Sequence, residues 1–184
     1  MKNTSLLLIV TTLSLAGAPA FGGTLTFNGD TTGLSVFNRP TEPGDALSDI
    51  GTAVPYFDQQ FTVGLSGNYN LTFQAADPGS YDTFLHLYAG SFNAAAPLNN
   101  FLGANDDAPG GSAFGSALAG VSLTAGSTYV FVTDGFANSD FGAFTASITG
   151  PGVVSVVPEP SAMALAGIGF TLLGLARRRN SISK

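Results

Sequence analysis

Alternation of apolar and polar residues is the main pattern in the central part of the chain. Tyr69–Phe73 and Phe144–Ile148 alternate with a period of two, which is typical of a strand with one buried face. Thr128–Thr133 is a continuous run of β-branched and aromatic residues, as in a fully buried strand. Phe84–Tyr88 is similar, and the period of two places His86 on the same face as Phe84 and Tyr88. These four segments predict strands.

Shorter segments complete the pattern. Further strands are expected at Thr24–Phe27, Tyr56–Val63 and Val121–Leu123, and residues 93–120 are expected to be mostly loop with one or two short strands. Clusters of Gly, Asn, Asp, Pro and Ser separate the strands, and no sustained helical periodicity occurs between residues 21 and 157. The sequence therefore predicts an all-β, jelly-roll-like β-sandwich domain over residues 21–157.

The two ends of the chain differ from this body. Lys2 precedes an apolar run, Leu6–Leu15, and Ala18-Pro19-Ala20 follows, which predicts a removed signal peptide over residues 1–20. The alternative, a membrane helix, is disfavoured because the run is short.

The carboxyl-terminal end has three parts in a fixed order. Pro158-Glu159-Pro160 precedes the uncharged run Ser161–Ala176, and Arg177, Arg178 and Arg179 follow directly. A helix over this run would be about 24 Å long, against about 30 Å for a hydrocarbon core, so it predicts a marginal membrane span. The arginines are expected to stay cytoplasmic, which leaves the body outside.

This order of elements in residues 158–184 resembles the PEP-CTERM sorting signal of Gram-negative bacteria. The resemblance implies recognition by an exosortase, a membrane enzyme thought to cleave near Pro158-Glu159-Pro160, with an anchored or released protein at the cell surface. It also implies an association with exopolysaccharide and biofilm matrix. The alternative is an ordinary tail anchor, which does not require Pro-Glu-Pro at that position.

Charge and cysteine content exclude several function classes. The body carries eleven acidic residues and one base, Arg39, a formal charge of −10, whereas the whole chain is at −6 because most bases lie in the two ends. Such a field repels phosphate backbones, so nucleic acid is excluded as a partner, and it favours divalent cations. The chain has no cysteine, which excludes disulfides, thiolate metal sites and thiol catalysis.

The body also resembles bacterial prepeptidase C-terminal and CUB-like β-sandwich domains. The resemblance lies in Tyr81–Ser91, in Asn105-Asp106-Asp107, in the hairpin Leu123–Val132 and in the closing strand from Gly142 to Ile148. It implies a non-catalytic jelly-roll-like module.

Catalytic residues are scarce in the sequence. His86 is the single histidine, and a Ser-His-Asp triad would have to use it. No Gly-x-Ser-x-Gly motif occurs, and adjacent carboxylates such as Asp106 and Asp107 usually point apart. We therefore predict that the protein is not an enzyme.

The candidate site is a calcium site. Calcium binds six to eight oxygens, and Asn105, Asp106 and Asp107 offer three such side chains in one loop. The CUB-like resemblance adds Asp82 as a fourth ligand. The alternative is that Asp82 caps a turn and the other residues form a solvated loop.

The sequence thus predicts an exported, non-catalytic structural or interaction protein, associated with extracellular polysaccharide or biofilm matrix. A small secreted hydrolase and a plain membrane-anchored adhesin are the alternatives.

Overall fold

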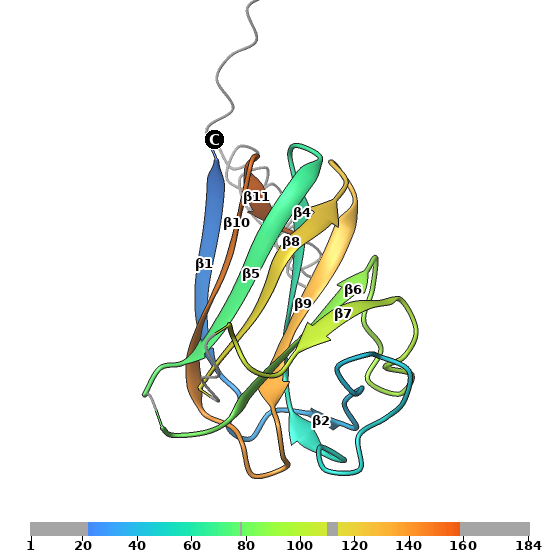
Figure 1. The fold of residues 1–184 in the computed structure, drawn as a ribbon, viewed down its shortest axis with the longest axis vertical. Helices are drawn as coiled ribbons and strands as arrows, with labels where there is room; N and C mark the ends of the chain where they lie inside the picture. Colours follow the sequence, from blue (N-terminus) through green and yellow to red (C-terminus); the bar gives the residue numbers. More distant parts are fainter. Residues whose placement is uncertain (1–21, 78, 110–113, 159–184) are drawn as a thin grey trace, which may run out of the picture.

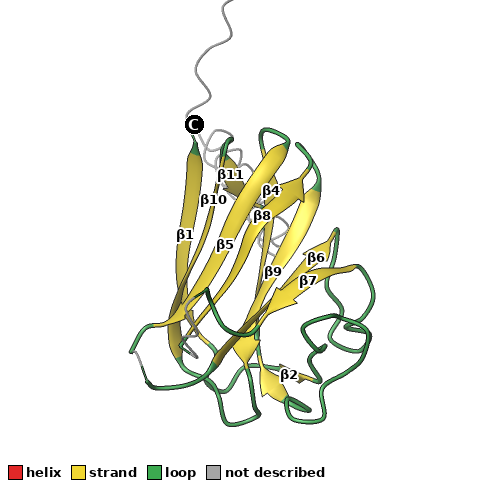
Figure 2. Ribbon diagram, viewed as in Figure 1, coloured by secondary structure: helices red, strands yellow, loops and turns green. Residues whose placement is uncertain are grey.

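Two antiparallel sheets form the body of the molecule (Figures 1 and 2). The computed structural model describes residues 22–77, 79–109 and 114–158, and within them it contains strands but no helix. The strands are β1 (Gly23–Asp30), β2 (Val36–Phe37), β3 (Val54–Pro55), β4 (Phe57–Val63), β5 (Gly67–Ala75), β6 (Thr83–Ala89), β7 (Phe101–Asn105), β8 (Gly115–Leu123), β9 (Thr128–Gly135), β10 (Ala143–Gly150) and β11 (Val154–Val156).

The chain passes back and forth between the two sheets. The first sheet has the order β1-β10-β5-β8, the second has the order β11-β4-β9-β6-β7, and β2 pairs with β3 in a separate two-stranded sheet. All these pairings are antiparallel. The predicted all-β sandwich is confirmed.

The main core lies between the two sheets. In β5, Tyr69, Leu71 and Phe73 are buried while Asn70 and Thr72 are exposed, as the alternation predicts. The inward side chains of the first sheet pack against those of the second. Several phenylalanine rings in this core meet edge to face; the ring centroids of Phe73 and Phe144, on neighbouring strands of the first sheet, lie 5.3 Å apart. Removing this apolar surface from water is the main stabilising contribution.

A second apolar cluster covers the outer face of the second sheet. Tyr88 and Val132 of this sheet pack there against Phe37 of β2 and Val54 of β3. Strands β6 and β9 are therefore buried on both faces, which explains why their sequences are apolar runs rather than alternating patterns. Leu85 and Leu87 of β6 face the main core, opposite Tyr88, as the period of two predicts.

The sequence predicted the strands with a strong apolar pattern better than those with a weak one. The strand predicted at Val121–Leu123 is in fact nine residues long and begins at Gly115, because its first half is rich in Ala and Gly, which carry little strand signal. β7 is a short strand of the kind expected between residues 93 and 120. The short strands β2, β3 and β11 were not predicted; β2 pairs with β3, and β11 pairs with β4.

The predicted end segments lie outside the described residues. This applies to the signal peptide at 1–20 and to the hydrophobic helix at 161–176 with the arginines that follow it. Within the described part of the chain no helix is long and apolar enough to span a membrane.

Candidate metal centre

Strands β6 and β7 bring the predicted aspartates together. Asp82 directly precedes β6, and Asp106 and Asp107 directly follow β7. The two strands are antiparallel neighbours, with Leu85 paired to Asn105. The start of one strand therefore lies beside the end of the other, although the sequence separates them.

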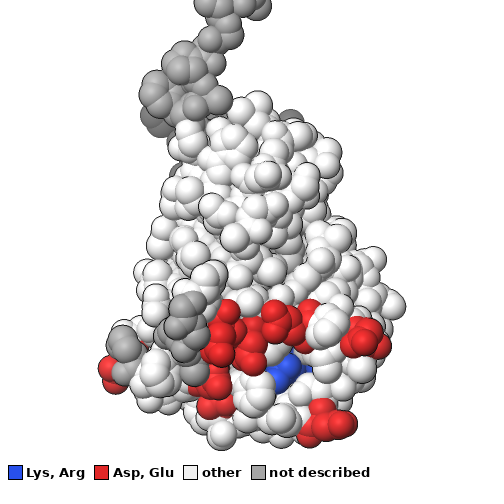
Figure 3. All heavy atoms as spheres, viewed as in Figure 1, with Lys and Arg blue, Asp and Glu red and all other residues white. Residues whose placement is uncertain are grey.

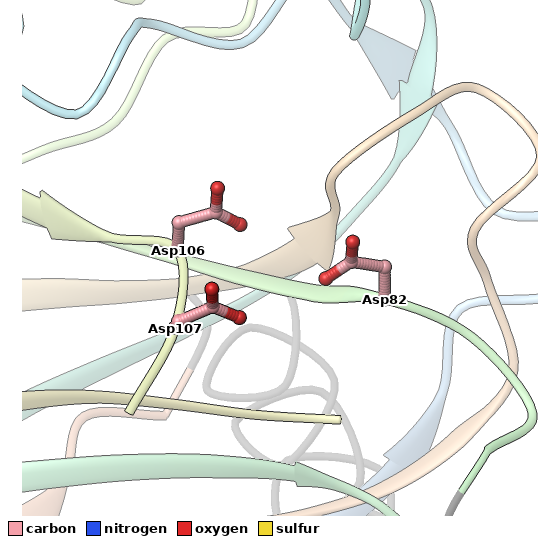
Figure 4. Close-up of side chains that lie close together, drawn as sticks. All are labelled: Asp82, Asp106 and Asp107. Carbon is pink, nitrogen blue, oxygen red and sulfur yellow. The ribbon is translucent and has the colours of Figure 1, made fainter. Parts of the chain in front are cut away.

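The three carboxylates converge on one point. One oxygen from each of Asp82, Asp106 and Asp107 lies within 4.8 Å of the other two. Figure 4 shows the carboxylate of Asp82 directed toward those of Asp106 and Asp107. Asp82 and Asp106 are half-buried, and Asp107 is exposed, so the cluster opens to solvent.

The loop that carries Asp106 is held by the first residues of β8. The Ser116 hydroxyl donates to the main-chain carbonyl of Asp106 and also pairs with the Thr83 hydroxyl at 2.7 Å. The Asn105 side-chain oxygen accepts from the Ala117 amide at 2.7 Å, and its amide donates to Glu42 at 3.4 Å. Asn105 thus fixes the loop, and its predicted part as a metal ligand stays a prediction.

The cluster holds more negative than positive charge, and this imbalance together with burial shifts the pKa values of its carboxyl groups. Burial raises the pKa of Asp82 to about 6, with repulsion from Asp140 and Asp107 adding to it and Arg39 opposing it. Burial likewise raises the pKa of Asp106 to about 6, helped by Asp82 and Asp107. The Oδ1 atoms of Asp82 and Asp106 are buried without a hydrogen-bond partner. Hard oxygen donors with unused lone pairs fit Ca²⁺, with water and main-chain oxygens completing the shell.

Arg39 is a buried cross-link beside the cluster. Its Nε and Nη2 atoms donate to the Phe136 carbonyl at 3.0 and 2.8 Å, and Nη1 donates to the Pro40 carbonyl at 3.2 Å. Its guanidinium carbon lies 3.9 Å from the ring centroid of Phe84 and 4.9 Å from that of Phe136. The only Lys or Arg among the described residues therefore joins two loops and offsets part of the surrounding negative charge.

The carboxylates gather around this arginine at one end of the molecule. Figure 3 shows the acidic side chains in the lower part of the visible face, around the single basic one. A hollow of about 430 Å³ opens there, lined by Arg39 and Asp106 together with apolar side chains such as Leu47, Ile50 and Phe84.

His86 has a partner that the sequence did not indicate. Its Nδ1 lies 2.8 Å from Asp134 Oδ2, and both side chains are fully buried. Its Nε2 lies 3.3 Å from the main-chain carbonyl oxygen of Pro40. Rings pack around it, with Phe84 stacked at 4.8 Å. The pair has the first two members of a catalytic triad, but among the described residues no hydroxyl hydrogen-bonds to Nε2, and no solvent reaches the imidazole.

Arg39 and Asp134 are the site residues that the sequence did not single out. For Arg39, the available signal was that it is the only base in an acidic body. For Asp134, the next-to-last residue of the buried strand β9, only the pairing of β6 with β9 places it near His86.

Comparisons with solved structures returned weak similarities to β-rich domains. The CBM35 from Cellvibrio japonicus Abf62 is 12% identical with a TM-score of 0.36, covering 73% of this chain and 99% of its own. The K1 cleaved adhesin domain of Lys-gingipain from Porphyromonas gingivalis W83 is 16% identical with a TM-score of 0.35, covering 78% of this chain and 95% of its own. No curated protein sequence matches the chain.

A family model matches the carboxyl-terminal end. Residues 156–180 match the PEP-CTERM protein-sorting motif, and this stretch contains Pro158-Glu159-Pro160 and the arginines at 177–179. The match begins within β11, so the motif starts where the sandwich ends. The chain therefore carries a PEP-CTERM sorting motif, which marks proteins exported to the cell envelope of Gram-negative bacteria.

Proposed function

We propose that this exported protein is a non-catalytic interaction module of the cell surface, stabilised by a calcium ion at its loop end. The observation that carries the calcium site is the convergence of Asp82, Asp106 and Asp107 within 4.8 Å, with two of their oxygens buried and unpartnered. A bound cation would satisfy these oxygens and offset the repulsion among the carboxylates.

Calcium would act as a structural ion at this position. The three aspartates lie at the ends of two neighbouring strands. The main-chain carbonyl of Asp106 accepts a hydrogen bond from Ser116 of β8, which belongs to the other sheet. An ion here would link β6, β7 and the start of β8. Its contribution is charge neutralisation and loop ordering, with no reaction step.

Thermal unfolding with and without calcium tests the site. An ion that binds only the folded state adds about 2.7 kcal/mol at a hundredfold excess over Kd, so Tm should rise by several degrees between excess chelator and millimolar calcium. The variant Asp106→Asn should lose most of this rise, because it removes one of the converging charges.

Asp77→Asn is the matched control for this experiment. Asp77 is exposed and lies outside the cluster, so this variant should keep the full calcium response. An unchanged Tm of the natural protein in calcium and in chelator would refute the site and leave the aspartates as turn residues.

The surroundings of His86 support the absence of catalysis. A general base must reach a proton on the substrate, and both ring nitrogens of this fully buried residue already have partners within the protein, Asp134 and the Pro40 carbonyl. The hydrolase alternative therefore lacks an accessible histidine base in the described part of the chain.

The sorting motif supports the cellular role. We expect an exosortase to act on the segment after Pro158, with the hydrophobic run 161–176 in the membrane until that step. We propose that the released module then stays in the extracellular polysaccharide or biofilm matrix. A protein that keeps its tail would instead be a membrane-anchored adhesin.

A further inference from the structure

The outer face of the first sheet carries a regular set of uncharged polar side chains. We call this set the polar grid. Eight of its nine members are exposed and Ser147 is half-buried. Its members are Thr24, Thr26 and Asn28 of β1, Thr145, Ser147 and Thr149 of β10, and Asn70, Thr72 and Gln74 of β5.

Strand register arranges the polar grid in three rows. Thr26 pairs with Ser147, and Ser147 pairs with Thr72, which makes the central row. The same register aligns Thr24 with Thr149 and Asn70, and it aligns Asn28 with Thr145 and Gln74. Neighbours lie about 4.8 Å apart across strands and about 6.7 Å apart along them. The face is thus a two-dimensional array of hydroxyl and amide groups.

Hydrogen bonds between the side chains order this array before any ligand arrives. Thr24 and Thr149 pair at 3.2 Å, Thr72 and Ser147 pair at 2.8 Å, and the Thr145 hydroxyl donates to Asn28 at 2.7 Å. Threonine is also stiff at χ1 because it is branched at Cβ. Binding through these groups therefore costs little side-chain entropy.

The face lacks the features that other classes of partner need. The four strands of this sheet contain one charged residue, Asp30, at the last position of β1. Figure 3 shows the upper part of the visible face without acidic or basic side chains. None of the large hydrophobic side chains that are exposed within the described residues belongs to these strands. Neither ion pairing nor apolar burial can drive docking on this face.

We propose that the polar grid binds an uncharged polysaccharide. A partner held by hydrogen bonds alone must be dense in neutral donors and acceptors, and a neutral glycan presents hydroxyl groups at spacings of a few ångströms. A polyanionic polymer gains no cation here, and a second copy of this chain would bury little apolar surface against the same face. The proposal rests on the proposed interaction role but does not depend on the calcium site.

Retention of the purified exported protein on polysaccharide gels tests the proposal. The probes are neutral glucan, galactan and mannan gels, with an alginate gel as the anionic counterpart. We expect retention on at least one neutral gel, none specific to alginate, and little change up to about 1 M salt, because screening acts on charges. Excess chelator should not abolish retention while the protein remains folded, so failure of the calcium site and failure of the grid give different results.

Variants of three threonines, one on each strand of the grid, test whether binding occurs there. The triple variant Thr26→Val, Thr72→Val and Thr145→Val removes three hydroxyls and keeps the shape and strand preference of the side chains. We expect about a tenfold or greater loss of retention, since each lost hydrogen bond weakens binding by roughly a few-fold. Thr124→Val, at an exposed turn position outside the grid, should bind normally, and the Tm of both proteins reports whether they fold.

Three outcomes would overturn the proposal. The first is no retention of the natural protein on any neutral gel. The second is full retention of the folded triple variant, which would place binding on another surface. The third is a dimer in sedimentation velocity that the triple variant abolishes while gel retention is unaffected, which would make the grid a self-association face.

Discussion

Asp82 and Asp106 each leave a buried carboxylate oxygen without a hydrogen bond. An unsatisfied buried acceptor lowers stability, and a charged one lowers it further. Without a cation, the folded protein can reduce this cost by protonating these carboxyls, which is why burial raises their pKa values to about 6. The same two residues can therefore be satisfied either by protons or by a metal ion.

The pH dependence of stability follows from these shifts. Both groups have a folded pKa of about 6 against an ordinary value of 3.8, so between these pH values the folded state binds more protons than the unfolded state. The stability that protonation provides is fully present below about pH 4 and is lost as pH rises through about 6. In chelator, this contribution should lower Tm between about pH 4 and pH 7, and calcium should restore Tm at pH 7.

The variant Asp106→Asn tests whether these carboxyl groups cause the pH dependence of Tm. An amide does not titrate, so this variant in chelator should show a smaller fall in Tm over the same pH range. If natural protein and variant have parallel profiles, the pH dependence arises from other groups.

At the same scale, the sequence predicted the aspartates but not their neighbours. Asp82 precedes a strong strand signal, whereas Asp106 and Asp107 follow β7, which lies in a region expected to be mostly loop. The three residues meet once β6 and β7 pair. Arg39 and Asp134 belong to segments whose packing against β6 is set by the tertiary fold. No local pattern encodes such contacts.

At the scale of elements, β6 and β9 depend on two layers of side chains. One face of each strand lies in the main core, and the other lies under the segment that carries β2 and β3. The apolar runs at Phe84–Tyr88 and Thr128–Thr133 indicated burial on both faces, but the covering segment has only two-residue strands and was not predictable by periodicity. Strands with a long and strong apolar pattern were thus predictable from the sequence, whereas the segment with β2 and β3 that buries their outer face was not.

The segment that carries β2 and β3, which we call the cover, should unfold together with the sandwich. Phe37 is 3% exposed and packs edge to face on Tyr56 and Phe92 at 5.1 and 5.3 Å. Replacing a buried Phe by Ala typically lowers the free energy of unfolding by about 3–5 kcal/mol. We expect Phe37→Ala to reach that range in urea unfolding with a single transition.

Val36→Ala is the adjacent control in the same strand. Val36 is 53% exposed, so its truncation should change the free energy of unfolding by less than about 1 kcal/mol. A small effect of Phe37→Ala, similar to that of the control, would mean that the cover opens independently of the sandwich.

At the scale of the whole molecule, folding and sorting occupy separate parts of the chain. The last strand ends at Val156, and the sorting motif covers residues 156–180. Pro158, at the end of the described residues, is exposed. The acidic body carries its single arginine in a buried cross-link, whereas the tail carries a run of three. A change within the motif should therefore affect the destination of the protein and leave its stability unaltered.

Mass spectrometry of the exported protein tests this separation. If the tail is a processing signal, the mature chain from cells with an active exosortase should lack Arg177–Arg179, because a segment that holds the protein in the membrane is useful only until cleavage. Glu159→Ala removes the one charge between the two prolines and should cause accumulation of the unprocessed chain at the membrane. Its Tm should equal that of the natural protein, because residue 159 follows the last strand. Recovery of natural protein that extends to Lys184 from such cells would instead identify the tail as a permanent anchor.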